Sequence, residues 1–119
     1  MSELALKDGL TGTTYTRKGI YKKNRMEEIM EMIVAVCQKH AADRIVLFGS
    51  RAKGTALERS DIDIAVSGAE DFGTMQEEIE FLPTLYKIDV VNLDTCRNKE
   101  LLEDIAKYGK KIYEKISVV

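Results

Sequence analysis

The segment from Asp61 to Val66 constrains the fold more than any other part of the sequence, because apolar and other residues alternate in it without a break. This period of two is the spacing of side chains along a half-buried β-strand. The apolar face is made by Ile62, Ile64 and Val66. The opposite face begins with two acids, Asp61 and Asp63, which therefore point the same way.

Two further short segments are typical of strands. The apolar run that starts at Arg44 and ends at Phe48 is bounded by Gly49, as expected of a buried strand. The run from Lys87 to Leu93 is also apolar, apart from Asp89.

Helical periodicity surrounds these strands. A first helix is predicted from Arg25 to about His40. His40 closes this helix and should cap its last carbonyl groups. A second is predicted around Met75 to Leu82, because Pro83 would stop it. A last helix is predicted from the helical spacing of Leu101, Leu102, Ile105, Tyr108 and Ile112, ending near Gly109 or slightly beyond. The lysines at this end should form a solvated helix face: Lys107, Lys110, Lys111 and Lys115.

The order of these elements predicts an α/β (α+β) fold in which helices back a small mixed β-sheet. A chain of 119 residues closes one hydrophobic core. We therefore expect one domain from residue 25 to residue 119, preceded by a loosely ordered arm at residues 1–24, which show no sustained periodicity.

Composition excludes several classes of function. The formal net charge is −2, which gives no general attraction to nucleic acid or to an anionic membrane. No apolar run is long enough to span a membrane. Cys37 and Cys96 lie far apart, so a zinc site or disulfide framework is not expected; Cys37 falls on the apolar stripe of the first helix and should be buried. These features are typical of a cytoplasmic protein.

Asp61 and Asp63 are the first candidates for chemistry. Their Cβ atoms should lie roughly 6 to 7 Å apart, which suits two carboxylates that converge on Mg²⁺. The alternative is an ordinary solvated face of an edge strand.

Asp89 is a third candidate, because an acid in an apolar strand is costly unless it is paired or binds a metal. If its strand lies beside the Asp61–Val66 strand, three acids meet on one surface. The alternative is an ion pair with Lys87 or a nearby arginine.

The turn at Gly49 and Ser50 is a candidate phosphate site. Gly49 would allow backbone to approach closely, and Ser50 would offer its hydroxyl and N–H. Arg51 or Lys53 could offset the charge of a triphosphate.

Taken together, Gly49-Ser50, ten intervening residues, the Asp61-x-Asp63 pair and then Asp89 resemble the DNA polymerase β-like nucleotidyltransferase superfamily. Within it, the chain is similar to the minimal nucleotidyltransferases, which are often encoded beside a HEPN-domain protein. The resemblance covers about residues 25 to 112.

The resemblance implies a catalytic role for Asp61, Asp63 and Asp89, which would hold two Mg²⁺ ions. It also implies ATP as the substrate, held by Gly49 and Ser50, with AMP transferred and pyrophosphate released.

Three biological roles stay open. The first is an antitoxin that adenylylates a HEPN toxin partner on a tyrosine hydroxyl, as part of a hetero-oligomer. The second is adenylylation of a small molecule or of another protein. The third is a stoichiometric antitoxin that binds its partner without catalysis. A homo-oligomer is also compatible with the sequence.

Overall fold

The computed structural model describes residues 24–116. Residues 1–23, which form nearly all of the predicted N-terminal arm, lie outside this range, so the arm stays a prediction. By its internal packing the chain divides into two units, Met1–Glu31 and Met32–Val119. The boundary between these units falls within helix α1 (Arg25–Lys39).

Helix α1 begins at Arg25 because Asn24 caps it. The Asn24 side chain accepts a hydrogen bond from the N–H of Glu27 at 2.8 Å, and the Glu27 carboxylate accepts one from the N–H of Asn24 at 3.0 Å. This reciprocal pair is a capping box, which satisfies two N–H groups that the first turn of a helix leaves without partners.

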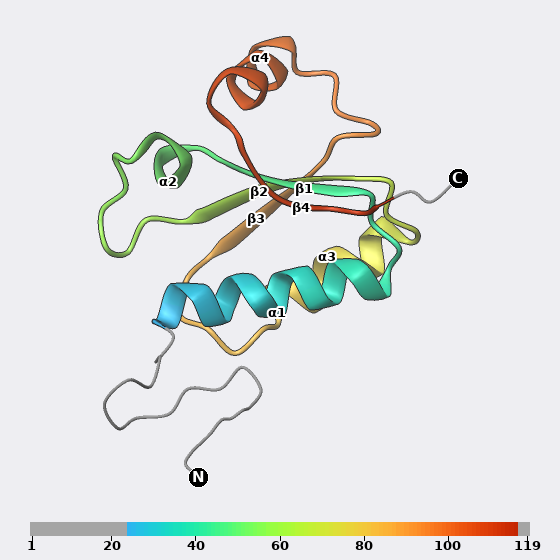
Figure 1. Ribbon diagram of the computed structural model, residues 1–119, viewed down its shortest axis with the longest axis horizontal. Helices are drawn as coiled ribbons and strands as arrows, with labels where there is room; N and C mark the ends of the chain where they lie inside the picture. Colours follow the sequence, from blue (N-terminus) through green and yellow to red (C-terminus); the bar gives the residue numbers. More distant parts are fainter. Residues whose placement is uncertain (1–23, 117–119) are drawn as a thin grey trace, which may run out of the picture. The chain divides into compact units, whose positions relative to one another are not determined.

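Four strands form one mixed sheet, in the order β3-β2-β1-β4 (Figure 1). They are β1 (Arg44–Phe48), β2 (Ile62–Ser67), β3 (Ile88–Asn92) and β4 (Lys110–Glu114). β1 is antiparallel to both β2 and β4, whereas β2 and β3 are parallel. The predicted small mixed sheet is confirmed.

Strand β4 corrects the prediction that the lysines after Gly109 continue a helix. Gly109 has extended backbone angles, φ −63° and ψ 147°, which end α4 (Lys99–Tyr108) and direct the chain along the open edge of β1. Lys110 and Lys111 are therefore residues of an edge strand, where charged side chains discourage pairing with further strands.

The remaining helices are α2 (Ser50–Lys53) and α3 (Phe72–Glu80). Helix α3 begins three residues before the predicted Met75, because the Asp71 carboxylate accepts a hydrogen bond from the N–H of Thr74 at 3.4 Å. It ends at Glu80, before Pro83 as predicted. Asn98 caps α4 in the same way, accepting from the N–H of Leu101 at 3.0 Å.

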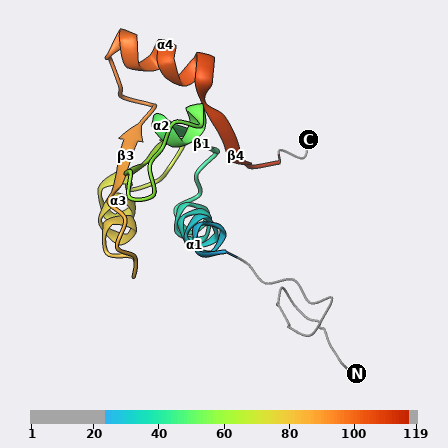
Figure 2. The ribbon, with the colours of Figure 1, turned by 90° about the vertical axis from the view of Figure 1, so that its left-hand side faces the viewer.

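Helices α4 and α3 cover opposite faces of the sheet (Figures 1 and 2). On the α4 face, Ile105 packs into a cluster of buried residues with Val46, Phe48 and Ala65. On the other face, α3 packs against β3. The side chains that are almost fully buried include Ile33, Ile62, Ile64, Met75 and Ile79. Apolar burial on both faces is the main force that holds such a layered domain together.

Cys37 is fully buried, as predicted from its place on the apolar stripe. Burial raises the pKa of its thiol to about 11, because the thiolate would lose its hydration. Cys37 is therefore a neutral packing residue at physiological pH and not a nucleophile.

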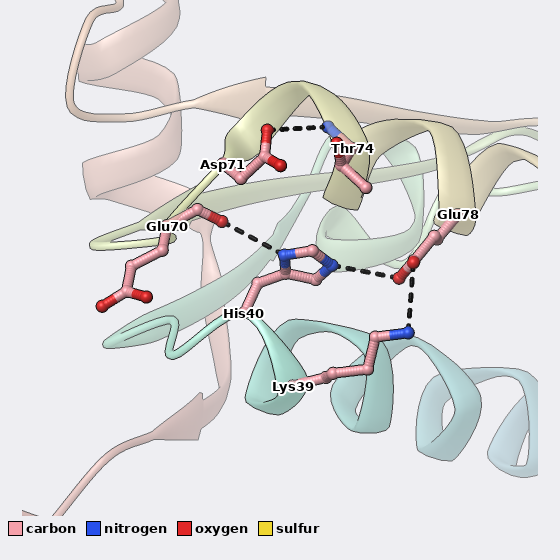
Figure 3. Close-up of polar contacts among 6 residues, drawn as sticks. All are labelled: Lys39, His40, Glu70, Asp71, Thr74 and Glu78. Atoms are coloured by element: carbon pink, nitrogen blue, oxygen red, sulfur yellow. Dashed lines mark hydrogen bonds and ion pairs between the residues drawn. The ribbon is translucent and has the colours of Figure 1, made fainter.

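The His40 side chain does not cap the last carbonyls of α1, so that prediction was wrong; the backbone N–H of His40, not its ring, donates to the carbonyl oxygens of Val36 at 3.3 Å and Cys37 at 3.1 Å. Its ring joins α1 to the chain around α3 instead (Figure 3). Nδ1 lies 3.1 Å from the carbonyl oxygen of Glu70, and Nε2 lies 3.0 Å from Oε1 of Glu78. Lys39 donates a hydrogen bond to the other oxygen of the Glu78 carboxylate at 3.1 Å.

Among residues 24–116, no helix has both the length and the apolar character needed to cross a membrane.

Candidate active site

Asp63 and Asp89 lie side by side at the centre of the candidate site. They are Cα partners in the parallel register of β2 and β3. Ile62 and Ile64 alternate with Asp63 and are fully buried, so Asp63 points to the face that carries Ala65, which is the α4 face. The condition set for the acids to meet, that the strands of Asp63 and Asp89 are neighbours, is therefore satisfied.

The electrostatic environment of Asp63 opposes its charged form. Partial burial raises the pKa of its carboxyl group, and the nearby charges of Asp89 and Asp61, together with a hydrogen bond to Asp89, raise the pKa further. Lys87 acts in the opposite direction and lowers the pKa. Repulsion among the carboxylates therefore exceeds the compensation that one lysine provides.

Asp89 also forms the ion pair that was considered as the alternative for it. Lys87 Nζ lies 3.7 Å from Asp89 Oδ1, but both side chains are well exposed, at 71% and 44%. Solvent weakens such a pair. The ion pair and the contact with Asp63 thus exist together.

The three predicted metal ligands do not form a ready-made site. Within the part of the chain that the structure describes, no group of three or more His, Cys, Asp or Glu side chains is arranged to hold a metal ion. Asp63 and Asp89 are brought within hydrogen-bonding distance, whereas Asp61 is exposed just before β2. The donor set nevertheless fits a hard divalent cation, because it consists of carboxylates whose mutual repulsion a cation would relieve.

Gly49 adjoins the acids because β1 ends beside them. Phe48, the last residue of β1, pairs with Asp63 in the antiparallel register. Gly49 follows with φ +75°, which is unfavourable for any residue with a Cβ atom, and a Cβ atom there would collide with Oδ2 of Asp63. Ser50 then starts α2 and is half-buried. The turn, and with it Ser50, thus lies next to the carboxylates.

Arg51 is engaged within the protein. Its guanidinium group donates hydrogen bonds to the carbonyl oxygens of Ser60 at 2.7 Å and of Glu58 at 3.2 Å. It also lies over the ring of Tyr86, 5.0 Å from the centroid. Arg51 therefore anchors the loop that leads into β2, and its contact with phosphate stays a prediction.

Lys53 has a different partner. Its Nζ lies 3.0 Å from Oδ1 of Asp104 in α4 and 5.0 Å from the ring centroid of Tyr108. It thereby links α2 to α4. A phosphate contact of Lys53 also stays a prediction, and Asp104 would compete with phosphate for the ammonium group.

Asp104, Tyr86 and Tyr108 were not singled out from the sequence as partners of the site. Asp104 and Tyr108 lie at helical spacing on α4 and resemble surface residues of any amphipathic helix. Only the packing of α4 near α2 reveals their contacts with Lys53.

Comparison with known families identifies the chain. Residues 31–117 match the family described as polymerase beta, nucleotidyltransferase. The chain belongs to this nucleotidyltransferase family. The family assignment agrees with the Gly49-Ser50 turn and the acids on β2 and β3, which the resemblance in sequence had indicated.

Solved structures give the same result for the fold of this nucleotidyltransferase. A chain from a toxin-antitoxin complex with AMP-PNP is 24% identical, with a TM-score of 0.59, over 71% of this chain and 73% of that chain. A minimal nucleotidyltransferase is 26% identical, with a TM-score of 0.56, over 71% of this chain and 90% of that chain.

A third similar chain comes from a complex of a tri-AMPylated HEPN toxin with an MNT antitoxin from Shewanella oneidensis. It is 20% identical, with a TM-score of 0.56, over 75% of this chain and 72% of that chain. Comparison with curated proteins finds no match.

Proposed function

We propose that this nucleotidyltransferase transfers AMP from ATP to a hydroxyl group of a HEPN-domain partner and thereby neutralises it. The observation that carries the proposal is the direct pairing of Asp63 with Asp89 beside the Gly49-Ser50 turn. This arrangement combines a place for phosphates with carboxylates that suit a divalent cation.

In this proposal Gly49 and Ser50 hold the triphosphate, and Asp61, Asp63 and Asp89 hold two Mg²⁺ ions. Bound Mg²⁺ would stabilise negative charge on the attacking and leaving oxygens. Because Asp61 does not complete a group of three ligands in the structure, its carboxylate would have to turn toward Asp63 when the ions bind.

The reaction is a substitution at the α-phosphorus of ATP. The acceptor oxygen forms a bond to this phosphorus, the bond to the oxygen that bridges the α- and β-phosphates breaks, and pyrophosphate leaves with the bonding electrons. The proton of the acceptor hydroxyl passes to a carboxylate, and this proposal assigns that role to Asp89, whose side chain is 44% exposed and so accessible to an acceptor.

Similarity to chains from toxin-antitoxin complexes supports a HEPN partner. One similar chain was solved in a complex with AMP-PNP and another in a complex that contains an AMPylated HEPN toxin. Adenylylation of a small molecule and neutralisation by binding alone are the competing outcomes.

The test is incubation with Mg²⁺ and labelled ATP, alone and with any HEPN-domain protein encoded beside this chain, followed by intact mass spectrometry. The proposal expects the partner to gain the mass of AMP and expects Asp63→Asn to abolish the gain. Asp43→Asn is the matched control, because Asp43 pairs with Lys115 at 3.5 Å outside the acidic cluster. A tight complex without a change in mass would instead establish a stoichiometric antitoxin.

A further inference from the structure

Arg51 carries a buried polar atom that has no partner. Among residues 24–116, its Nε is the only buried side-chain nitrogen or oxygen atom without a hydrogen bond. Burying an N–H group in this way is unfavourable, so other contacts of the side chain must hold it in place. The question is which parts of the fold those contacts connect.

The contacts are made by the guanidinium group. Its Nη2 atom donates to the carbonyl oxygens of Ser60 and Glu58, at 2.7 and 3.2 Å. The same group lies over the ring of Tyr86, with Cζ 5.0 Å from the centroid. A planar, forked donor can bond to two carbonyl groups at its edge while its face covers a ring, whereas a compact ammonium group cannot. Arg51 therefore joins the segment before β2 to the segment before β3.

The segment before β2 is a closed turn. The hydroxyl oxygen of Ser60 accepts a hydrogen bond from the N–H of Leu57 at 2.8 Å, and the N–H of Ser60 donates to the carbonyl oxygen of Leu57 at 3.0 Å. These reciprocal bonds make residues 57–60 one compact unit. Arg51 holds this unit by two of its carbonyl groups, and Asp61 is the next residue along the chain. Arg51 thus fixes the backbone from which Asp61 extends.

The segment before β3 belongs to the same arrangement. Tyr86, which lies against the guanidinium group, comes three residues before Asp89 in the sequence. Between them, the carbonyl oxygen of Lys87 accepts a hydrogen bond from the N–H of Ile62 at 2.9 Å, which begins the parallel pairing of β2 with β3. Arg51 therefore contacts both segments of the chain that lead to the acids.

Asp61 depends on such an anchor because it is the acid that stands apart. Its side chain is exposed, and the described residues contain no complete group of three metal ligands. With its backbone fixed, Asp61 can reach a cation beside Asp63 by turning its side chain alone. With its backbone free, the ordering of the loop would be added to the cost of binding the cation.

We propose that Arg51 is a positioning residue, which holds the backbone of Asp61 where its carboxylate can bind divalent cations together with the acids of β2 and β3. The inference rests on the proposed function for the metal role of these acids. Arg51 acts through the backbone of the loop and not on the phosphates of the nucleotide. Residues that orient metal ligands in this way contribute roughly 10- to 100-fold to metal affinity or activity.

Titration with Mn²⁺, followed by electron paramagnetic resonance, tests the inference without nucleotide or partner. Mn²⁺ prefers the same oxygen ligands as Mg²⁺. Arg51→Lys keeps the positive charge but loses the planar fork, so the Kd for Mn²⁺ should rise about tenfold or more. The Kd for ATP without divalent cations should stay nearly unchanged. Arg59→Lys, at an exposed arginine of the same loop, is the matched control and should leave both constants as in the wild type.

Tyr86→Leu is a second test, which leaves Arg51 in place and removes only the ring beside it. The Kd for Mn²⁺ should rise in the same direction by roughly two- to fivefold. Thermal unfolding establishes that each variant is folded, and Tyr86→Leu decides the matter if Arg51→Lys does not fold. A wild-type Kd for Mn²⁺ in the folded variants would refute the positioning role. A rise in the Kd for ATP alone would make Arg51 a phosphate ligand instead.

The outcomes separate this inference from the proposed function. If Mn²⁺ binding depends on Arg51 but the wild-type protein transfers no AMP to a HEPN-domain partner, the positioning role stands and the proposed reaction is refuted. If AMP is transferred and Mn²⁺ binding does not depend on Arg51, the reaction stands and the positioning role is refuted. If the wild-type protein binds no Mn²⁺, both are rejected.

Discussion

Gly49 faces Asp63 so closely that a Cβ atom at position 49 would collide with the Asp63 carboxylate. Gly49→Ala adds this collision to the strain of a positive φ, so we expect a loss of about 2 to 3 kcal/mol in the free energy of unfolding. Displacing the Asp63 carboxylate should also reduce AMP transfer on the order of 100-fold. Chemical denaturation and a transfer assay measure the two effects.

Gly54→Ala separates strain from collision. Gly54 has nearly the same φ, +78°, but nothing lies within 4 Å of an added Cβ atom. This variant should lose about 1 to 2 kcal/mol of stability and keep its transfer activity. Equal loss of activity in both variants would show that contact with Asp63 is not what Gly49 protects.

Asp63→Asn should stabilise the metal-free protein at neutral pH. Burial and the neighbouring acids raise the pKa of Asp63 above its usual 3.8, so the folded state binds this proton more tightly than the unfolded state does. The resulting stability is present at low pH and is lost as the pH rises through the folded-state pKa. At pH 7 the charged carboxylate therefore lowers stability, and Asn removes this cost.

Thermal unfolding in EDTA at several pH values measures the effect. Because the side chain is half-buried and solvent screens the repulsion, we expect an increase in Tm of roughly 2 to 4 °C at pH 7 that disappears below about pH 4. Asp43→Asn should show no such increase, because it removes an ion pair. A Tm for Asp63→Asn at or below that of the wild type at pH 7 would contradict the crowding of the three acids.

The acids were predictable from the sequence because strand alternation is a local property. Asp61 and Asp63 flank Ile62, and the period of two alone puts them on one face. The parallel pairing of Asp63 with Asp89 was conditional, since the sequence does not state which strands are neighbours. That relationship depends on contacts between residues far apart in the chain.

Strand β4 shows where local patterns fail. Lys110 and Lys111 continue the lysine-rich end of α4 and have no alternation of their own, so they resemble a helix face. Their conformation is decided by the free edge of β1, which accepts a partner strand. The contacts of Arg51 with Tyr86 and of Lys53 with Asp104 could not be predicted from the sequence either, because only the tertiary fold brings these residues together.

Asp104→Asn tests whether Lys53 can serve the nucleotide. The ion pair is partly exposed, so its loss should cost less than about 1 kcal/mol of stability. Freed from Asp104, the ammonium group of Lys53 becomes available to a triphosphate, and the Kd for ATP should fall about two- to threefold.

Glu103→Gln is the control for the change in net charge, because Glu103 is an exposed neighbour on the same helix. Isothermal titration with ATP and Mg²⁺ compares the two variants. Equal affinities in Asp104→Asn and Glu103→Gln would leave Lys53 with only its structural contact to α4. An affinity gain in Asp104→Asn that Lys53→Met abolishes would assign the gain to this ammonium group.

Glu78 should make the stability of the fold depend on pH in the acidic range. Hydrogen bonds from His40 and, next, from Lys39 lower the pKa of Glu78 below its usual 4.5. A carboxyl group whose pKa is lower in the folded state stabilises the fold above the unfolded-state pKa, and this stability is lost as the pH falls through the folded-state pKa.

Glu78→Gln should therefore lower the Tm at pH 7, and its difference from the wild type should shrink below about pH 4.5. Glu77→Gln on the adjacent exposed position of α3 is the control for the loss of one negative charge from this helix. If both variants showed the same profile, the contact between His40 and Glu78 in Figure 3 would not be what fastens the end of α1 to α3.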